Sequence, residues 1–309
     1  APTTAGTPSS RAMIAAWQVR PPLFVTMAEA RFMIGSQSGS VMSVTSTSPS
    51  RIRSMWSRFM MRRAVPAPMR PPMNLSVSVT GHRDLVEDEK PALANRVQAL
   101  FEELNRRYPD LELQLLSGLA EGADRLVASV ALELSIPLVA VLPMEREEYL
   151  RDFTSAASRE EFRRLLEEAG QVIELPLMSA GETDRTECDH EARDRQYAQL
   201  GVFLSNHCQV LLALWDGKPS DAIGGTAEVV RYHLTGVMKG IESELSSAAL
   251  LSENENDLAH HIVCSRDSAD GEPTSGLKPA QSTWFTSQEE GKRFSEIPQA
   301  YDTLLQRLQ

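Results

Sequence analysis

The sequence predicts an α/β domain built on a doubly wound, mainly parallel sheet with helices on both faces. Strand-like and helix-like segments alternate along residues 74–264, which is typical of βαβ units. Two continuous apolar runs, residues 136–142 and 210–215, are of the kind found in strands that are covered on both faces. Glycines and acidic residues follow several predicted strands, where the loops of such a sheet open on one edge and ligands bind.

Charge is distributed unevenly along the chain of 309 residues, whose formal charge is −11. Residues 1–73 contain nine Arg, no Lys and a single acid, Glu29, and so carry +8, which leaves −19 for residues 74–309. A body this acidic is expected to be a poor general binder of nucleic acid. We therefore expect no nucleic-acid partner.

Residues 1–73 also differ from the rest in composition. They are rich in Ser, Arg, Pro and Met and show neither clean helical nor strand periodicity, so we expect a disordered or spurious leader. The Arg-rich, acid-poor composition is similar to that of an organellar transit peptide. The favoured interpretation is an over-extended leader with Met73 near the real start.

Cysteine usage and hydropathy predict a cytoplasmic protein with no membrane segment in this chain. Cys188, Cys208 and Cys264 are widely spaced and odd in number, which fits a reducing compartment better than a disulfide framework. The longest apolar stretch of the body, residues 130–143, is interrupted by Glu133 and is shorter than the roughly 20 residues that a membrane-spanning helix needs.

The periodicity of apolar residues sets the expected elements. We expect strands at residues 75–79, 111–116, 136–142, 171–175, 210–215 and 261–264. We expect helices from residue 91 to before Pro109, after the glycine turn at 117–124, at 159–169, at 191–206 and from 226 onward. The first strand alternates apolar residues with serines and is expected to be half-buried. Residues 180–189 and 265–287 are expected to form loops.

The chain therefore divides into a leader at 1–73, a ligand-binding domain at 74–264 and a C-terminal part at 265–309. The last stretch repeats Ile297, Tyr301 and Leu305 at helical spacing, so we expect an amphipathic helix that starts near Pro298. Such stripes ordinarily pack against their own domain, and we favour this over a helix that binds a partner.

The stretch that organises the domain is residues 117–124, Ser-Gly-Leu-Ala-Glu-Gly-Ala-Asp, which joins a strand to a helix. A helix start of this kind leaves backbone N–H groups unpaired, and the helix dipole adds partial positive charge, so a phosphate is the expected ligand. Gly81 and Gly225 stand at equivalent strand ends. The alternative for each glycine is a tight turn without ligand contact.

Two residues after the first strand are candidates for ligand contact. Arg83 could hold a phosphate with its planar guanidinium, or it could form a salt bridge with Asp84 or Glu87. His82 could contact a base or ribose, although capping of the turn is favoured for a lone histidine.

Three acids have both a functional and a structural interpretation. Glu121 would accept hydrogen bonds from ribose hydroxyls or activate water if it faces the pocket. Asp124 lies in a first helical turn, where the helix dipole favours an acid regardless of function. Asp216 is placed like a ribose-binding acid, although Asp216 followed by Gly217 is also a plain turn.

The sequence contains no recognisable metal or nucleophile motif. Cys188 and His190 make a pair rather than the four ligands of a structural zinc. Neither a Gly-x-Ser-x-Gly elbow nor an HExxH helix is present. We expect no metal and no cofactor.

Four motifs in order, TGHRD at 80–84, SGLAEGAD at 117–124, ALWDG at 213–217 and GGTAE at 224–228, carry a resemblance to a known group. The chain resembles the SLOG superfamily, the Rossmann-like group named for the Smf/DprA and Lonely Guy proteins, and in particular its bacterial branch of nucleotide sensors. The resemblance covers about residues 74–264. It implies a nucleotide or nucleotide-derived ligand at the converging loops.

Carried over by motif, the resemblance implies a first phosphate-ribose loop and a second one. It assigns to these loops Gly118, Glu121, Gly122 and Asp124, and then Gly224, Gly225 and Thr226, with Ser117 beside them. Lonely Guy enzymes, which split nucleoside monophosphates, have a Glu three positions after the Thr, where this chain has Val229. Glu228 stands one residue earlier, and Ile223 replaces the preceding Pro. The DNA-loading branch is disfavoured by the acidic charge of the body.

Three hypotheses follow for function. The first is a non-catalytic module that binds and senses a nucleotide-derived small molecule. The second is an N-glycoside hydrolase of nucleoside monophosphates, in which Glu121 or Glu228 would be catalytic. The third is an interaction scaffold that uses the C-terminal helix without any ligand. Assembly into a homo-oligomer is left open by the sequence.

Overall fold

The structure is a computed structural model that describes residues 73–177, 190–238, 257–289 and 291–309. All of these belong to one compact unit, Pro68–Gln309. The predicted leader, apart from Met73, and the rim loop predicted at 180–189 lie outside the described residues, as does Cys188.

A seven-stranded sheet with the order β4-β3-β2-β1-β5-β6-β7 forms the centre of the unit. Six strands are parallel, and the last runs antiparallel to β6. The strands are β1 (Asn74–Gly81), β2 (Glu112–Ser117), β3 (Leu138–Leu142), β4 (Gln171–Glu174), β5 (Val210–Trp215), β6 (Ala259–Val263) and β7 (Ser282–Phe285). The chain builds outward from β1 to β4 and then returns to β5 on the other side of β1. The predicted doubly wound, mainly parallel α/β fold is therefore confirmed, with its switch point between β1 and β5.

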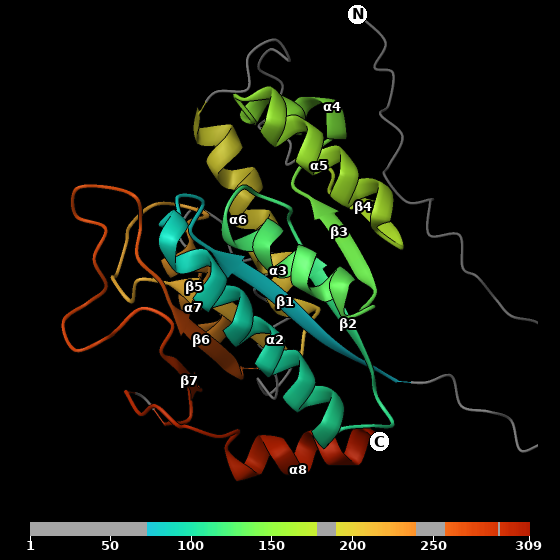
Figure 1. Ribbon diagram of the computed structural model, residues 1–309, viewed down its shortest axis with the longest axis vertical. Helices are drawn as coiled ribbons and strands as arrows, with labels where there is room; N and C mark the ends of the chain where they lie inside the picture. Colours follow the sequence, from blue (N-terminus) through green and yellow to red (C-terminus); the bar gives the residue numbers. More distant parts are fainter. Residues whose placement is uncertain (1–72, 178–189, 239–256, 290) are drawn as a thin grey trace, which may run out of the picture. The chain divides into compact units, whose positions relative to one another are not determined.

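Helices cover both faces of this sheet (Figure 1). One face carries α2 (Lys90–Arg107), α3 (Ala123–Glu133) and α5 (Ala156–Glu168). The other face carries α6 (His190–Asn206) and α7 (Thr226–Thr235). All five were expected from the sequence, whereas the short η1 (Glu87–Glu89), α4 (Arg146–Tyr149) and η2 (Leu150–Asp152) were not. Among the described residues, no helix has the length and apolar character needed to cross a bilayer.

β1 is not half-buried, as its alternating pattern predicts, but buried on both faces. Its serines are small enough to lie beneath helices, and their hydroxyls have partners. Ser78 Oγ donates to the carbonyl of Leu204 in α6 at 2.9 Å, and Gln114 Nε2 donates to Ser76 Oγ at 2.6 Å. Because β1 is the central strand, alternation here separates large from small buried residues rather than buried from exposed ones.

The segment expected to be a loop at residues 265–287 contains β7. Trp284, in its middle, is 1% exposed, and its backbone exchanges two 2.8 Å hydrogen bonds with Phe294. The β-branched and aromatic residues of this strand favour extended structure, but four residues give too short a pattern to recognise within a polar segment. The prediction of a loop is therefore wrong for this part.

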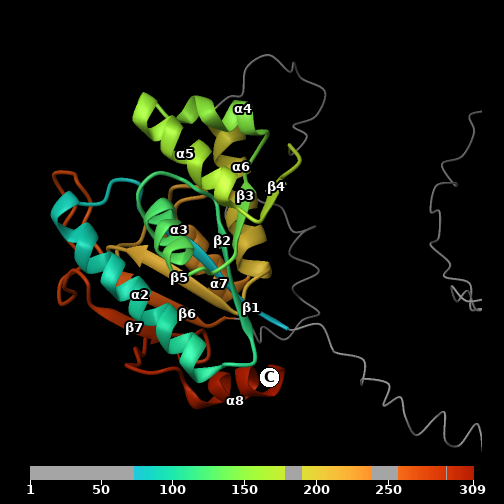
Figure 2. The same cartoon turned by 45° about the vertical axis from the view of Figure 1, so that its right-hand side comes forward.

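The C-terminal helix α8 (Gln299–Leu308) packs on its own domain, as predicted. Tyr301 and Leu305 are buried in the same core as β1. At the end of α2, Arg107 Nε and the Tyr108 hydroxyl donate to Asp302 at 2.7 and 2.8 Å (Figure 2). The apolar stripe of this helix is thus used inside the unit.

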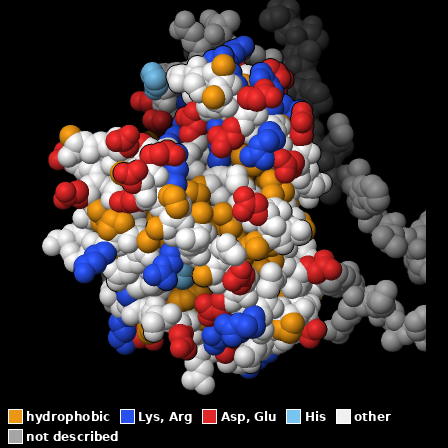
Figure 3. Space-filling model, in the orientation of Figure 1, with side chains coloured by type: hydrophobic (Ala, Val, Ile, Leu, Met, Phe, Trp, Pro, Cys, Tyr) orange, Lys and Arg blue, Asp and Glu red, His pale blue; other side chains and the backbone are white. Residues whose placement is uncertain are grey.

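The surface carries both signs of charge. On the face shown in Figure 3, Asp and Glu side chains are interspersed with Lys and Arg side chains, and neither sign covers the face alone.

Candidate functional site

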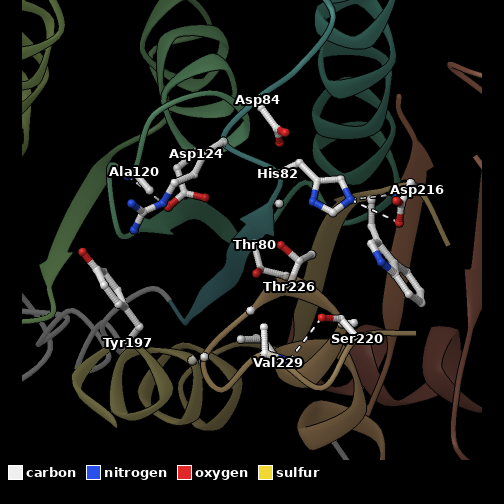
Figure 4. A pocket seen from close by; sticks show the side chains of 18 of the residues that line it. Thr80, His82, Asp84, Ala120, Asp124, Tyr197, Asp216, Ser220, Thr226 and Val229 are labelled. Carbon is white, nitrogen blue, oxygen red and sulfur yellow. Dashed lines mark hydrogen bonds and ion pairs between the residues drawn. The ribbon is translucent and has the colours of Figure 1, made fainter. Parts of the chain in front are cut away.

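A pocket of about 580 Å³ lies at the carboxyl ends of β1 and β5, the switch point of the sheet (Figure 4). All four loops that carry the sequence motifs contribute to it. Its walls include residues 80–84 after β1, Ala120 and Asp124 near the start of α3, Trp215 and Asp216 after β5, and residues 224–227 at the start of α7. The volume is within the range of small-molecule sites. We refer to it as the first pocket.

His82 and Asp216 join the two strand ends at the floor of the first pocket. His82 Nε2 lies 3.2 Å from both the backbone nitrogen and the Oδ1 atom of Asp216. Burial lowers the pKa of His82, and the nearby Asp216 carboxylate opposes this shift only in part. The imidazole is therefore neutral at neutral pH, and its Nε2 accepts the backbone N–H of Asp216. This contact is the turn-stabilising role favoured from the sequence.

Asp216 itself is 3% exposed and receives the backbone N–H of Lys218 on Oδ1 at 3.0 Å. Among the described residues, none donates a hydrogen bond to its second oxygen, Oδ2. Gly217 follows with φ +80°, where a Cβ would lie 2.6 Å from Leu277, so its role is the turn. Asp216 lines the first pocket, whereas Gly217 does not.

The glycine turn before α3 is already occupied by the protein's own groups. Ala123 N donates to the His82 carbonyl at 3.0 Å, Ala120 N donates to Asp124 Oδ2 at 3.3 Å, and Leu119 N donates to Ser117 Oγ at 3.1 Å. The expectation of unpaired N–H groups aimed at an anion is therefore wrong for these three residues.

The glycines of this turn serve close packing. Gly122 has φ +77°, and a Cβ there would lie 2.3 Å from the carbonyl oxygen of Arg83, which follows β1. At Gly118 a Cβ would lie 2.8 Å from Leu200 of α6. Of the predicted residues in this turn only Asp124 lines the first pocket; Ser117, Gly118, Glu121 and Gly122 do not.

Neither catalytic candidate is part of the wall of the first pocket. Glu121 accepts a hydrogen bond from the Ser158 hydroxyl on α5. Glu228, which is 2% exposed, pairs with Arg231 through an Nη2–Oε2 contact of 2.5 Å. Val229, the next residue after Glu228, does line the pocket. An apolar side chain there can neither protonate a leaving group nor activate water.

Asp124 is a buried carboxyl group in the wall of the first pocket, 6% exposed. Burial raises its pKa to about 7, against the opposing effects of the Ala120 N–H and the charge of Arg83. A carboxyl group with such a pKa changes charge near neutral pH. The first pocket therefore carries a charge that depends on pH.

In the described part of the chain, no side chain caps either helix start, but the first N–H of α3, that of Ala123, already donates to the His82 carbonyl, and the start of α7 has no such contact. Gly224 has φ +71°, and a Cβ there would lie 2.7 Å from the backbone nitrogen of Ala198 in α6, so glycine lets the loop approach that helix. Gly225 is the N-cap, and the N–H groups of Thr226, Ala227 and Glu228 have no acceptor among the described residues. Gly224, Gly225 and Thr226 all line the first pocket. These N–H groups and the dipole of α7 make an anion site.

The remaining predicted residue, Arg83, lies over the ring of Tyr197 with 4.8 Å between Cζ and the ring centroid. Its expected alternative partner, Asp84, is paired with Arg266 instead at 3.1 Å. Tyr197, Lys218 and Arg266 also line the first pocket, and the sequence analysis did not find them. Arg266 is the third residue after β6, so its position near a strand end was a usable signal, whereas Tyr197 lies within a helix and carried none.

No group of three or more His, Cys, Asp or Glu residues that could hold a metal ion occurs in the part of the chain that the structure describes. Cys208 and Cys264 are both buried and unpaired with each other. Burial raises the pKa of Cys208 to about 12, so its thiol is unreactive at neutral pH.

Comparison with known proteins finds similar solved structures but no matching family. No protein-family model and no curated protein matches the chain. Among solved structures, the chain is similar to DNA processing protein A (DprA) from Streptococcus pneumoniae, with 16% identity, a TM-score of 0.34, and coverage of 57% of this chain and 56% of that one. It is also similar to DNA processing protein A from Helicobacter pylori, with 12% identity, a TM-score of 0.33, and coverage of 65% and 69%. The likeness is one of fold.

The comparison corrects one expectation. The expectation of no nucleic-acid partner is wrong as an exclusion, because the Helicobacter pylori protein, to which the chain is similar, is described by its unique single-stranded DNA binding mode. That expectation rested on the net charge of residues 74–309. Net charge does not describe a local surface, and Figure 3 shows basic side chains distributed among the acidic ones.

Proposed function

We propose that the first pocket binds a nucleotide or a nucleotide-derived small molecule, and that the phosphate is held by the first turn of α7. The observation that carries this proposal is the uncapped start of α7, which opens through Gly224, Gly225 and Thr226 into a pocket at the switch point of the sheet. Backbone N–H groups at a helix start are a general site for phosphate.

The side-chain charges of the first pocket favour a nucleotide over a simple polyanion. Its lining has three cationic side chains, those of Arg83, Lys218 and Arg266, and four Asp carboxyl groups. A free polyanion would be repelled by so many acids. In a nucleotide, ribose hydroxyls and base amino groups donate hydrogen bonds that carboxylates accept, and Asp216 is buried at the floor of the pocket beside the start of α7.

Binding without turnover is the role we propose, which makes the chain a sensor module rather than a hydrolase. Neither of the two glutamates that the sequence suggests as catalytic lies in the wall of the first pocket. Glu121 bonds to Ser158, and Glu228 pairs with Arg231, so both candidates are engaged outside the first pocket.

The test is a thermal shift measurement with the four common nucleoside 5′-monophosphates, followed by chromatography of each mixture for free base. We expect at least one nucleotide to raise the melting temperature and to be recovered intact. Release of base would contradict the sensor role, and a melting temperature unchanged by every nucleotide would contradict nucleotide binding.

The matched variants are Thr226→Val in α7 and Thr303→Val in α8. Thr226 lines the first pocket, whereas Thr303 is exposed, lines neither this pocket nor its neighbour, and donates its hydroxyl to the Gln299 carbonyl at 2.8 Å. We expect Thr226→Val to weaken nucleotide binding about tenfold or more, the loss of one hydrogen bond to a charged group. Thr303→Val should leave binding unchanged; an equal effect of the two variants would contradict the assignment.

A further inference from the structure

A second pocket, of about 510 Å³, lies on the other side of the loop that joins β5 to α7. Four residues belong to the lining of both pockets: Trp215, Pro219, Ser220 and Ala227. The first turn of α7 borders both, since Thr226 lines only the first pocket and Glu228 only the second. The two pockets are therefore neighbours that share one wall, and the uncapped helix start lies at that wall.

Cationic side chains outnumber acids in the second pocket, whereas acids outnumber cations in the first. Arg231, Lys292 and Arg293 line it, and its one acid is Glu228, whose carboxylate is already paired with Arg231. The cations of the lining thus outnumber its one acid by two, and Lys292 also pairs with the carboxylate of Glu289, which lies outside the lining. An anionic group that extends from the start of α7 is attracted into this pocket rather than repelled from it.

Aromatic rings and a fixed guanidinium give the second pocket a surface for a planar group. The rings of Trp215 and Phe285 belong to its wall. Arg293 Cζ lies 5.2 Å from the centroid of the Phe285 ring. Base-sized π systems stack on such rings and on guanidinium planes.

Arg293 is held in place by the sheet. Its Nη1 donates to His261 Nδ1 at 2.8 Å and to Thr283 Oγ1 at 3.2 Å. His261 Nε2 in turn lies 2.8 Å from the Trp215 carbonyl, so its proton is on Nε2, and Nδ1 is the acceptor. Burial lowers the pKa of His261 to about 4, which keeps this ring neutral. A cation fixed in this way loses little conformational entropy when a ligand binds.

We propose that the two pockets form one bipartite site for a dinucleotide, that is, two nucleoside units joined through phosphate. One nucleoside occupies the acidic first pocket, the bridging phosphates lie at the first turn of α7, and the second nucleoside stacks in the cationic, aromatic second pocket. This inference rests on the proposed function of the first pocket and extends it by naming the class of ligand.

The experiment compares three compounds of each nucleoside by isothermal titration with the full chain: the 5′-monophosphate, the 5′-diphosphate and the symmetric P1,P2-dinucleoside diphosphate. For the preferred nucleoside we expect the dinucleotide to bind at least about tenfold more tightly than either mononucleotide, about 1.4 kcal/mol. The diphosphate arm separates the effect of the added phosphate from that of the second nucleoside.

The variants are Lys292→Glu and, as a matched control, Lys278→Glu. Both lysines are exposed, and Lys278 lines neither pocket. We expect Lys292→Glu to weaken the dinucleotide about fivefold or more and the monophosphate less than about twofold, while Lys278→Glu changes neither.

Each outcome bears on one claim. A dinucleotide that binds no more tightly than the diphosphate, or a Lys292→Glu effect of equal size on mono- and dinucleotide, would overturn the bipartite site and leave the first pocket as a mononucleotide site. Absence of binding by every compound would overturn the proposed function itself. Tight dinucleotide binding with a selective Lys292 effect supports both.

Discussion

At the scale of single residues, the carboxyl group of Asp124 is the one whose charge depends most on its surroundings. Its pKa is raised by burial to about 7, from an ordinary value of 3.8. A carboxyl group with a raised pKa in the folded state stabilises the fold fully below pH 3.8, and that contribution is lost as the pH rises through about 7. At about 1.4 kcal/mol per pKa unit, the loss is on the order of 4 kcal/mol.

Asp124→Asn therefore should become more stable than the unsubstituted protein as the pH rises. Asn keeps an oxygen that can accept the Ala120 N–H but never becomes charged. We expect the difference in free energy of unfolding between variant and parent to shift in favour of the variant between pH 5.5 and pH 8.5, measured by urea denaturation. Asp110→Asn, at an exposed position, should show a constant difference; a pH-independent difference for Asp124→Asn would contradict the raised pKa.

Single residues also show what the sequence could not reveal about the site. The strand-end positions of the glycines correctly predicted that the four motif loops lie together. Whether an N–H group in such a loop is free depends on partners from distant strands, as when the His82 carbonyl accepts the Ala123 N–H. Likewise, Glu228 and Val229 are adjacent in sequence, yet only the orientation of α7 decides that the valine faces the first pocket.

At the scale of elements, the junction between β1 and α3 depends on one glycine. Gly122→Ala places a Cβ 2.3 Å from the Arg83 carbonyl and at φ +77°. Gly276 offers a matched control, since it has φ +90° but no atom within 4 Å of its Cβ position. We expect a loss of about 3 kcal/mol or more for Gly122→Ala and about 1 kcal/mol for Gly276→Ala, measured by urea unfolding. Equal losses would show that β1 and α3 do not approach this closely.

The C-terminal helix provides a second test at this scale. Leu305 is 2% exposed in the core shared with β1, whereas Leu308 on the same helix is only partly buried. Leu305→Ala should cost about 2 to 4 kcal/mol of folding free energy and Leu308→Ala about 1 kcal/mol or less. If Leu305→Ala left stability unchanged, α8 would be free to act as the partner-binding helix of the scaffold hypothesis.

Elements were predictable in proportion to the length and contrast of their patterns. The long helices α2 and α6 and the apolar strands β3 and β5 were found within about two residues of their ends. β7 was not predicted, because its four residues, Ser-Thr-Trp-Phe, are too few to establish an alternating pattern. The burial of β1 was underestimated, because a serine under a helix and a serine in water give the same sequence pattern.

At the scale of the whole molecule, the order of strands explains where the pockets are. The chain reverses direction across the sheet between β1 and β5, and the loops after these strands separate there. The first pocket lies between these loops and is lined by the start of α7 and by the buried acids. The loop from β5 to α7 separates it from the second pocket. Net charge, by contrast, was a poor guide, since it averages over two adjacent pockets, and only in the second do cations outnumber acids.

The central claim is that a nucleotide phosphate binds the first turn of α7, and amide NMR measures this most directly. The ¹H–¹⁵N spectrum of the chain would be titrated with the nucleoside monophosphate that gives the largest thermal shift. We predict that the largest downfield amide shifts belong to Thr226, Ala227 and Glu228, whose N–H groups have no described acceptor. Largest shifts at Ala123 and Asp124 of α3, or none at the start of α7, would contradict the account.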